Sequence, residues 1–190
     1  MTRSIHSHGR YSRFRREKVT GSSGAFLWGP TGTGKTCTTQ HLLEKLSETA
    51  DIETTTVDCW QQNSNSAIYH TLLPDIDPAH TLKRGTTART VLWERLCEQF
   101  DQQFVVVLDD VDQLKDEQAL YQFYEHELIT PILIANRKLD FFVGLDDRVE
   151  SRLRGYSSIH FQTYTDEELV AILSNRADAA LRPGAVSTLS

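Results

Sequence analysis

The glycine-rich octapeptide GPTGTGKT, Gly29–Thr36, constrains the fold of this chain more than any other feature. It follows the apolar run AFLW (Ala25–Trp28) and precedes a stretch with helical periodicity. It satisfies the pattern G-x-x-x-x-G-K-[ST] between a strand and a helix, which is the setting of a phosphate-binding loop. We therefore expect a bound nucleotide. The alternative is a glycine-rich turn that matches the pattern by chance.

Each position of the loop has an expected role. The glycines allow sharp turns that bring backbone N–H groups onto phosphate oxygens, and the following helix directs its positive end at the same anions. Lys35 would reach the β and γ phosphates, and the Thr36 hydroxyl would bind Mg²⁺. The candidate phosphate-binding residues are Gly29, Pro30, Thr31, Gly32, Thr33, Gly34, Lys35 and Thr36.

A second motif, FVVVLDDVDQL (Phe104–Leu114), reads as a buried strand that ends in two carboxylates. Ligands collect at the carboxyl edge of open α/β sheets, so we expect Asp109 in the Mg²⁺ shell beside Thr36. Asp110 follows, where a carboxylate can orient the attacking water. The pair favours hydrolysis of ATP over phosphoryl transfer to a second substrate. Alternatively, both acids are solvated turn residues.

Short strand-like runs alternate with longer amphipathic ones, which predicts an α/β fold with a five-stranded parallel sheet covered by helices. The expected strands are Ala25–Trp28, Glu53–Asp58, Phe104–Asp109, Ile132–Ala135 and Ser158–Phe161. The first expected helix is Lys35–Glu48, with Leu42, Leu43 and Leu46 on one side. The second is Thr87–Phe100, with Leu92, Leu96 and Phe100 on one face. The third is Asp166–Leu181, capped by Thr165.

Composition sets further limits. A length of 190 residues fits one domain with a core. The longest apolar runs, such as Phe104–Leu108, have five residues, against about 20 needed to cross a bilayer, so we expect no membrane contact. Three cysteines without a CxxC pair fit a reduced cytoplasm.

Charge is unevenly distributed around a net value of -6. The first 20 residues carry one acid, Glu17, and six basic residues: Arg3, Arg10, Arg13, Arg15, Arg16 and Lys18. The rest is acidic, which does not support general affinity for nucleic acid. We expect residues 1–23 to form a basic arm that is solvated, contacts phosphates such as those of DNA, or acts as a targeting segment. The 14 arginines against 6 lysines, with the acidic body, suit a salt-adapted archaeon.

With both motifs identified, the chain resembles an AAA+ ATPase of the P-loop class, with the additional strand, and within it archaeal replication initiators of the origin-recognition and cell-division-control type. Four stretches carry this resemblance: GPTGTGKT, VDCWQ (Val57–Gln61), VVVLDDVDQL and LIANRKLDFFVGLDDRVESRL (Leu133–Leu153). The segment YTDEELVAILSNRADAAL, Tyr164–Leu181, is similar to the start of the family's helical lid.

The resemblance implies further site residues. Asn136 matches the first sensor, an amide that reports the γ-phosphate and helps to place the water; otherwise it is a polar strand cap. Arg152 matches the arginine finger that reaches into a neighbouring subunit's site, and Arg148 is its nearest competitor. Their alternative is a surface salt bridge to Asp146, Asp147 or Glu150. Partners implied are ATP and other AAA+ subunits, identical or paralogous.

Other residues are less informative. Trp60 and Tyr69 could stack on a base, although an aromatic beside a strand is more often core. Lys83 and Arg84 lie where initiators touch DNA. We expect a nucleotide-binding core at residues 24–163 and a partial lid at 164–190, which ends before the family's second-sensor arginine and winged-helix domain.

The chain departs from the family at Asp110, where glutamate is usual; the shorter side chain would hold the water farther from the phosphate. Two functions follow as hypotheses. The first is a slowly hydrolysing ATPase module of replication initiation, related to origin recognition and helicase loading. The alternative is an interaction module, such as a shortened paralogue without DNA binding of its own. In this module bound ATP organises an interface and is not hydrolysed productively.

Overall fold

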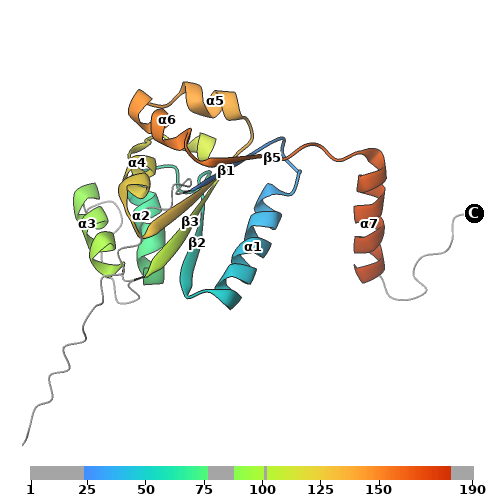
Figure 1. Cartoon of the computed structure of the whole chain (residues 1–190), viewed down its shortest axis with the longest axis horizontal. Helices are drawn as coiled ribbons and strands as arrows, with labels where there is room; N and C mark the ends of the chain where they lie inside the picture. Colours follow the sequence, from blue (N-terminus) through green and yellow to red (C-terminus); the bar gives the residue numbers. More distant parts are fainter. Residues whose placement is uncertain (1–23, 77–87, 101, 181–190) are drawn as a thin grey trace, which may run out of the picture.

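A parallel sheet of five strands forms the centre of the computed structural model, which describes residues 24–76, 88–100 and 102–180 (Figure 1). The strands are β1 (Ala25–Trp28), β2 (Ile52–Asp58), β3 (Gln103–Asp109), β4 (Ile129–Ala135) and β5 (Ser157–His160). Their order across the sheet is β2-β3-β4-β1-β5, and every neighbouring pair is parallel. The predicted α/β class and parallel sheet are confirmed.

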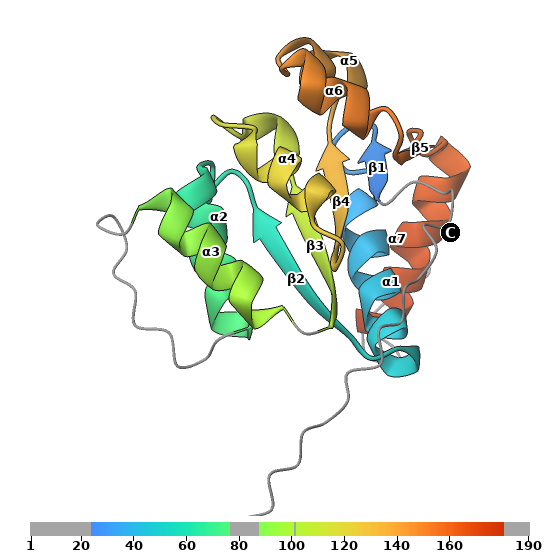
Figure 2. The same ribbon diagram turned by 60° about the vertical axis from the view of Figure 1, so that its left-hand side comes forward.

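Helices cover both faces of the sheet. They are α1 (Lys35–Thr49), α2 (Asn65–Ile76), α3 (Arg89–Gln99), α4 (Gln118–Glu125), α5 (Lys138–Val143), α6 (Asp147–Leu153) and α7 (Asp166–Ala180), with a 3₁₀ turn, η1, at Val111–Gln113. Figures 1 and 2 show α1 on one side of the sheet with α7 beyond it, and α2, α3 and α4 on the other side.

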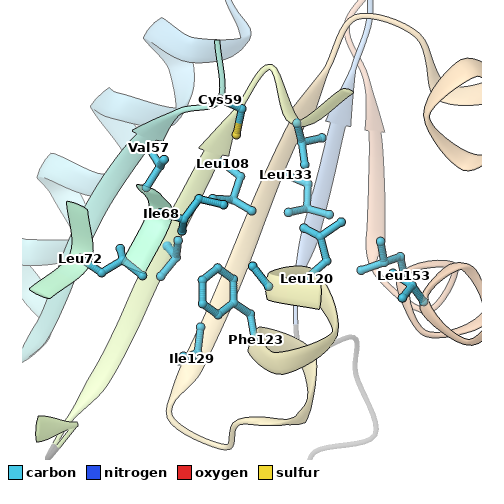
Figure 3. Close-up of a cluster of buried hydrophobic side chains, with 14 of the residues drawn as sticks. Val57, Cys59, Ile68, Leu72, Leu108, Leu120, Phe123, Ile129, Leu133 and Leu153 are labelled. Atoms are coloured by element: carbon cyan, nitrogen blue, oxygen red, sulfur yellow. The ribbon is translucent and has the colours of Figure 1, made fainter. Parts of the chain in front are cut away.

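The alternation of side chains along β3 builds two cores. Val105 and Val107 point to one face, where they cluster with Leu43 of α1. Val106 and Leu108 point to the other face, in a larger cluster that includes Ile68 and Phe123 (Figure 3). Because both faces are buried, β3 is apolar at successive positions rather than at every second one.

Most predicted boundaries agree with the structure to within two residues, and the exceptions have local causes. The observed β4 begins at Ile129, three residues before the predicted start at Ile132, because Pro131 lies within the strand and does not end it. Its pairing with β1 starts only at Ile132, so Pro131 lies outside that ladder. The three leucines predicted to share one side of α1 differ in burial: Leu43 is buried, Leu46 is partly buried and Leu42 is 48% exposed. Leu92, Leu96 and Phe100 do lie together on the core side of α3.

The predicted cap of α7 is confirmed. The Thr165 hydroxyl accepts a hydrogen bond of 3.3 Å from the backbone N–H of Glu168, and the Glu168 carboxylate accepts one of 2.8 Å from the N–H of Thr165. This reciprocal pair is a capping box, which fixes where the helix begins.

Candidate nucleotide-binding site

Strand register gathers the candidate residues at one edge of the sheet. Trp28, the last residue of β1, pairs with Ala135, the last residue of β4, and Asp109 pairs with Asp58 at the end of β2. The segments that follow these strands carry the glycine loop, Asp110 and Asn136. Parallel strands therefore bring the two sequence motifs together at their carboxyl ends, where open α/β sheets hold their ligands.

Two glycines of the loop are required by its geometry. A Cβ on Gly29 would lie 2.1 Å from the carbonyl oxygen of Phe161, so only glycine permits this approach. Gly34 has a φ of 86° and precedes α1 as its N-cap without a side-chain hydrogen bond to the helix. No side chain therefore caps the first turn of α1, whose N–H groups are directed at the space where phosphates would bind.

Lys35 is buried, with an exposed fraction of 6%, and its ammonium is held by oxygen atoms only. Nζ donates to the carbonyl oxygen of Gly29 at 2.7 Å, to that of Pro30 at 2.9 Å and to Asn136 Oδ1 at 3.2 Å. Burial lowers the pKa of Lys35, whereas the charges of Asp110 and Asp109 act in the opposite direction. The oxygen atoms that accept these three hydrogen bonds all belong to neutral groups.

Asn136 connects the loop to the second motif. Its Oδ1 accepts hydrogen bonds from Lys35 Nζ and from Thr31 Oγ1, each at 3.2 Å, and its Nδ2 donates to Asp110 Oδ1 at 3.0 Å. Both ends of one amide are thus used, one by a cation and one by a carboxylate. Asn136 therefore links the glycine loop, through Thr31 and Lys35, to Asp110 of the second motif.

Thr36 and Asp109 form the contact most relevant to a metal ion. The Thr36 hydroxyl donates to Asp109 Oδ2 at 2.7 Å, and Asp109 Oδ1 accepts the backbone N–H of Asp110 at 3.0 Å. Hydroxyl and carboxylate oxygens are the hard ligands that Mg²⁺ prefers, so this pair fits the ion. In the described part of the chain no cluster of three or more His, Cys, Asp or Glu residues is placed to hold a metal ion.

Asp110 has an unusual backbone and a raised pKa. Its φ of 52° and ψ of 48° lie in the left-handed region, which aspartate tolerates better than most residues. Burial raises its pKa first, and the neighbouring Asp109 carboxylate raises it further. Strained backbone and perturbed acidity at one residue are typical of functional sites.

The structure places Arg152 and Arg148 on α6, which packs against α4. The predicted alternative partners of Arg152 are wrong: its Nε donates to Glu125 at 2.8 Å, and Glu150 pairs with Arg154 instead. The different partner has a geometric cause, since Glu125 lies on α4, a helix that was not expected. Arg148 is exposed, and its side chain pairs with no residue in the described part of the chain.

Sequence reasoning missed the contact of Tyr164 with the loop. Its hydroxyl donates to the carbonyl oxygen of Thr33 at 3.1 Å, 131 residues earlier in the chain. No local spacing could have indicated this contact. Of the two aromatics without an assigned role, Tyr69 is core, at 1% exposure, whereas Trp60 is 63% exposed.

Several expectations lie outside the described residues. These are the basic arm with Arg3, Arg10, Arg13, Arg15 and Arg16, and the pair Lys83 and Arg84. Among the helices that are described, none has both the length and the apolar character that a membrane span requires.

Comparisons with known proteins agree with this geometry. Residues 19–142, more than half of the chain, match the family described as AAA domain. The chain is 40% identical over 164 residues to ORC1-type DNA replication protein 1 of Halobacterium salinarum, and 34% identical over 165 residues to ORC1-type DNA replication protein 9 of the same organism. The alignments cover 86% of this chain but only 53% and 47% of those relatives, so the chain spans about half their length.

Solved structures give the same picture. The structure of the Aeropyrum pernix ORC1 protein in complex with DNA matches with a TM-score of 0.73 and 26% identity, over 86% of this chain and 46% of that one. Cdc6p from Pyrobaculum aerophilum matches in fold with a TM-score of 0.75 at 24% identity, over 86% and 45% of the two chains.

Proposed function

The chain belongs to the AAA domain family, as an archaeal Orc/Cdc6-type AAA+ module related to the initiation of DNA replication, and from this premise we propose that it binds ATP with Mg²⁺ and hydrolyses it slowly. The observation that carries the proposal is the meeting of two motifs, 73 residues apart, in the 2.7 Å hydrogen bond between Thr36 and Asp109. Few other chemistries use a buried lysine, an uncapped helix start and such an oxygen pair at one sheet edge.

Each residue of the site has a proposed task. The N–H groups of residues 29–36 bind the phosphate oxygens, and Lys35 leaves its carbonyl partners for the terminal phosphates. Thr36 and Asp109 hold Mg²⁺, which would neutralise charge on the phosphate tail. Asp110 orients a water molecule, and Asn136, which already contacts both Lys35 and Asp110, reports whether the terminal phosphate is present.

Slow hydrolysis follows from Asp110. Its side chain is one methylene shorter than that of glutamate. Asn136 Nδ2 donates to its Oδ1 at 3.0 Å, and this hydrogen bond restricts the rotation of the carboxylate. A water bound by this side chain therefore lies farther from the phosphate than a glutamate would place it. If turnover is absent, the same geometry supports the alternative function, an interaction module that ATP organises without hydrolysis.

We also propose that the chain associates with other AAA+ subunits, to which Arg152 contributes a guanidinium that stabilises charge on the transferred phosphoryl group. The proposed boundary between the core and the lid is residue 164, just before α7. DNA contact is proposed for the basic arm and for Lys83 and Arg84. It is tested by deleting residues 1–16, which should lower any salt-sensitive retention of DNA.

The central experiment is a calorimetric titration of ATP with and without Mg²⁺ into the parent chain, Lys35→Ala and Lys45→Ala. Lys45 is an exposed lysine on the same helix, so Lys45→Ala is a matched control. We expect binding by the parent and the control and none by Lys35→Ala, with all three equally folded. Equal affinity of Lys35→Ala and the parent would contradict the proposal.

A further inference from the structure

The side chain of Arg152 is held by residues of α4 that no part of the proposed function uses. Its Nε donates to Glu125 Oε1 at 2.8 Å. Its guanidinium carbon lies 4.7 Å from the ring centre of Tyr121 and 5.6 Å from that of Tyr124. We name Tyr121, Tyr124 and Glu125 the α4 cradle.

The cradle leaves one edge of the guanidinium available. Arginine has five N–H donors. Within the described residues three are used: Nε by Glu125, one on Nη1 by the carbonyl oxygen of Arg148 at 3.0 Å, and one on Nη2 by the Tyr121 hydroxyl at 3.4 Å. Each terminal nitrogen therefore retains one N–H that no described residue accepts, and two such groups of one guanidinium can bind two oxygens of a phosphate.

The helix that carries Arg152 is itself anchored. Val149 and Leu153 of α6 are buried, with exposed fractions of 5% and 2%, and α6 packs on α4. Arg152 lies three residues from Val149 and next to Leu153, and its side chain remains 30% exposed. The guanidinium is thus fixed in position and still accessible to a second molecule.

Arg148 lies one helical turn before Arg152 on the same side of α6, but its guanidinium is not held by other described side chains in this way. It is exposed, and no side chain in the described ranges restrains its guanidinium. A free arginine loses its rotational freedom on binding, whereas one held in place has lost it beforehand. The cradle therefore distinguishes between two arginines that spacing alone leaves as competitors.

We propose that Tyr121, Tyr124 and Glu125 are positioning residues, which orient Arg152 so that its two remaining N–H groups meet the nucleotide phosphates of a second copy of this chain. The inference rests on the proposed function, because it needs Arg152 to act on a neighbour's site. It adds that α4, and not only α6, belongs to the surface that meets the neighbour.

The test is a complementation assay between two variants. The donor, Lys35→Ala, binds no nucleotide but keeps Arg152; the receiver, Arg152→Ala, binds nucleotide but lacks the arginine. Each is expected to be inactive alone, and their mixture should hydrolyse ATP. Adding Glu125→Gln to the donor should lower this activity about tenfold, because misplaced catalytic groups lose effective concentration. Glu125→Gln in the receiver should have no effect.

Matched variants separate positioning from general stability. Glu150→Gln in the donor removes the ion pair with Arg154, a contact of the same kind on α6, and should leave complementation unchanged. Tyr121→Phe in the donor keeps the ring beneath the guanidinium and should retain most activity, whereas Tyr121→Leu should not. If the parent chain hydrolyses ATP but the mixture of Lys35→Ala and Arg152→Ala does not, the proposed action of Arg152 in trans is overturned, and the inference with it. An active mixture that does not respond to Glu125→Gln in the donor, or that responds equally in donor and receiver, overturns the cradle alone.

Discussion

The hydroxyl of Thr36 lies 2.7 Å from a carboxylate oxygen of Asp109, and the two side chains offer a divalent cation a ready pair of oxygen ligands. The pair joins the start of α1 to the end of β3. If Thr36 and Asp109 hold Mg²⁺ as proposed, a nucleotide bound with the ion contacts both elements, which makes this pair suitable for mutagenesis.

Thr36→Val removes the hydroxyl and keeps the shape of the side chain. We expect ATP affinity in Mg²⁺ to fall roughly tenfold or more, as for the loss of other groups at metal sites, and affinity in EDTA to stay unchanged. Isothermal titration under both conditions measures the difference. Thr38→Val, at an exposed position of the same helix, serves as the control. An equal loss in EDTA would show that the hydroxyl contributes to binding without the metal.

Asp110→Glu restores the length of side chain that the resemblance implies. We expect the single-turnover rate of ATP hydrolysis to rise about tenfold, equivalent to about 1.4 kcal/mol of barrier. Asp112→Glu lengthens a nearby acid with no proposed role and should leave the rate unchanged. Equal and negligible rates for the parent and Asp110→Glu would favour the interaction module over the slow ATPase.

Asp110→Asn should stabilise the fold at neutral pH while it abolishes hydrolysis. The pKa of Asp110 is raised by burial and by Asp109, so its ionised form is disfavoured in the native state. A carboxyl group whose pKa is higher in the folded than in the unfolded state stabilises the fold at pH values below its unfolded-state pKa. This contribution is lost as the pH rises through its folded-state pKa. The asparagine lacks this loss, and we expect Asp110→Asn to have a higher free energy of unfolding than the parent at pH 7.

The gain from Asp110→Asn should shrink as the pH falls, because the parent aspartate then becomes protonated. Urea unfolding at neutral pH and at a pH near the ordinary carboxyl pKa measures both values. Asp51→Asn, at an exposed position between α1 and β2, serves as the control. A gain that does not depend on pH would contradict electrostatic strain at Asp110.

Gly29→Ala and Gly32→Ala form a matched pair within the loop. A Cβ at Gly29 meets the carbonyl oxygen of Phe161, whereas a Cβ at Gly32 has no neighbour within 4 Å and only an unfavourable φ of 84°. We expect Gly29→Ala to cost about 3 kcal/mol from overpacking and Gly32→Ala about 1 kcal/mol from backbone strain. Denaturant unfolding distinguishes them, and equal costs would refute the close approach at Gly29.

Sequence predicted the fold where patterns are long or specific. The apolar strands and the glycine loop placed β1, β3 and α1, and the motifs indicated which side chains would meet at the sheet edge. Helices α2, α4, α5 and α6 were not expected. The last three have eight, six and seven residues, too few for a helical period to stand out from neighbouring polar positions.

Contacts between distant segments escaped prediction altogether. The partner of Arg152 is Glu125, 27 residues away on α4, and local spacing favoured Asp146, Asp147 or Glu150 instead. The left-handed backbone of Asp110 also has no signal in the letters DDVDQ. Such features depend on how elements pack, which a pattern along the chain does not contain.

The segment between β5 and α7 is fastened to the glycine loop near both of its ends. The N–H of Phe161 donates to the carbonyl oxygen of Trp28 at 2.8 Å beside Gly29, and Tyr164 binds the carbonyl oxygen of Thr33. These two contacts connect the start of α7 to the glycine loop through a short segment, so the position of this helix depends on the backbone of the loop as well as on β5.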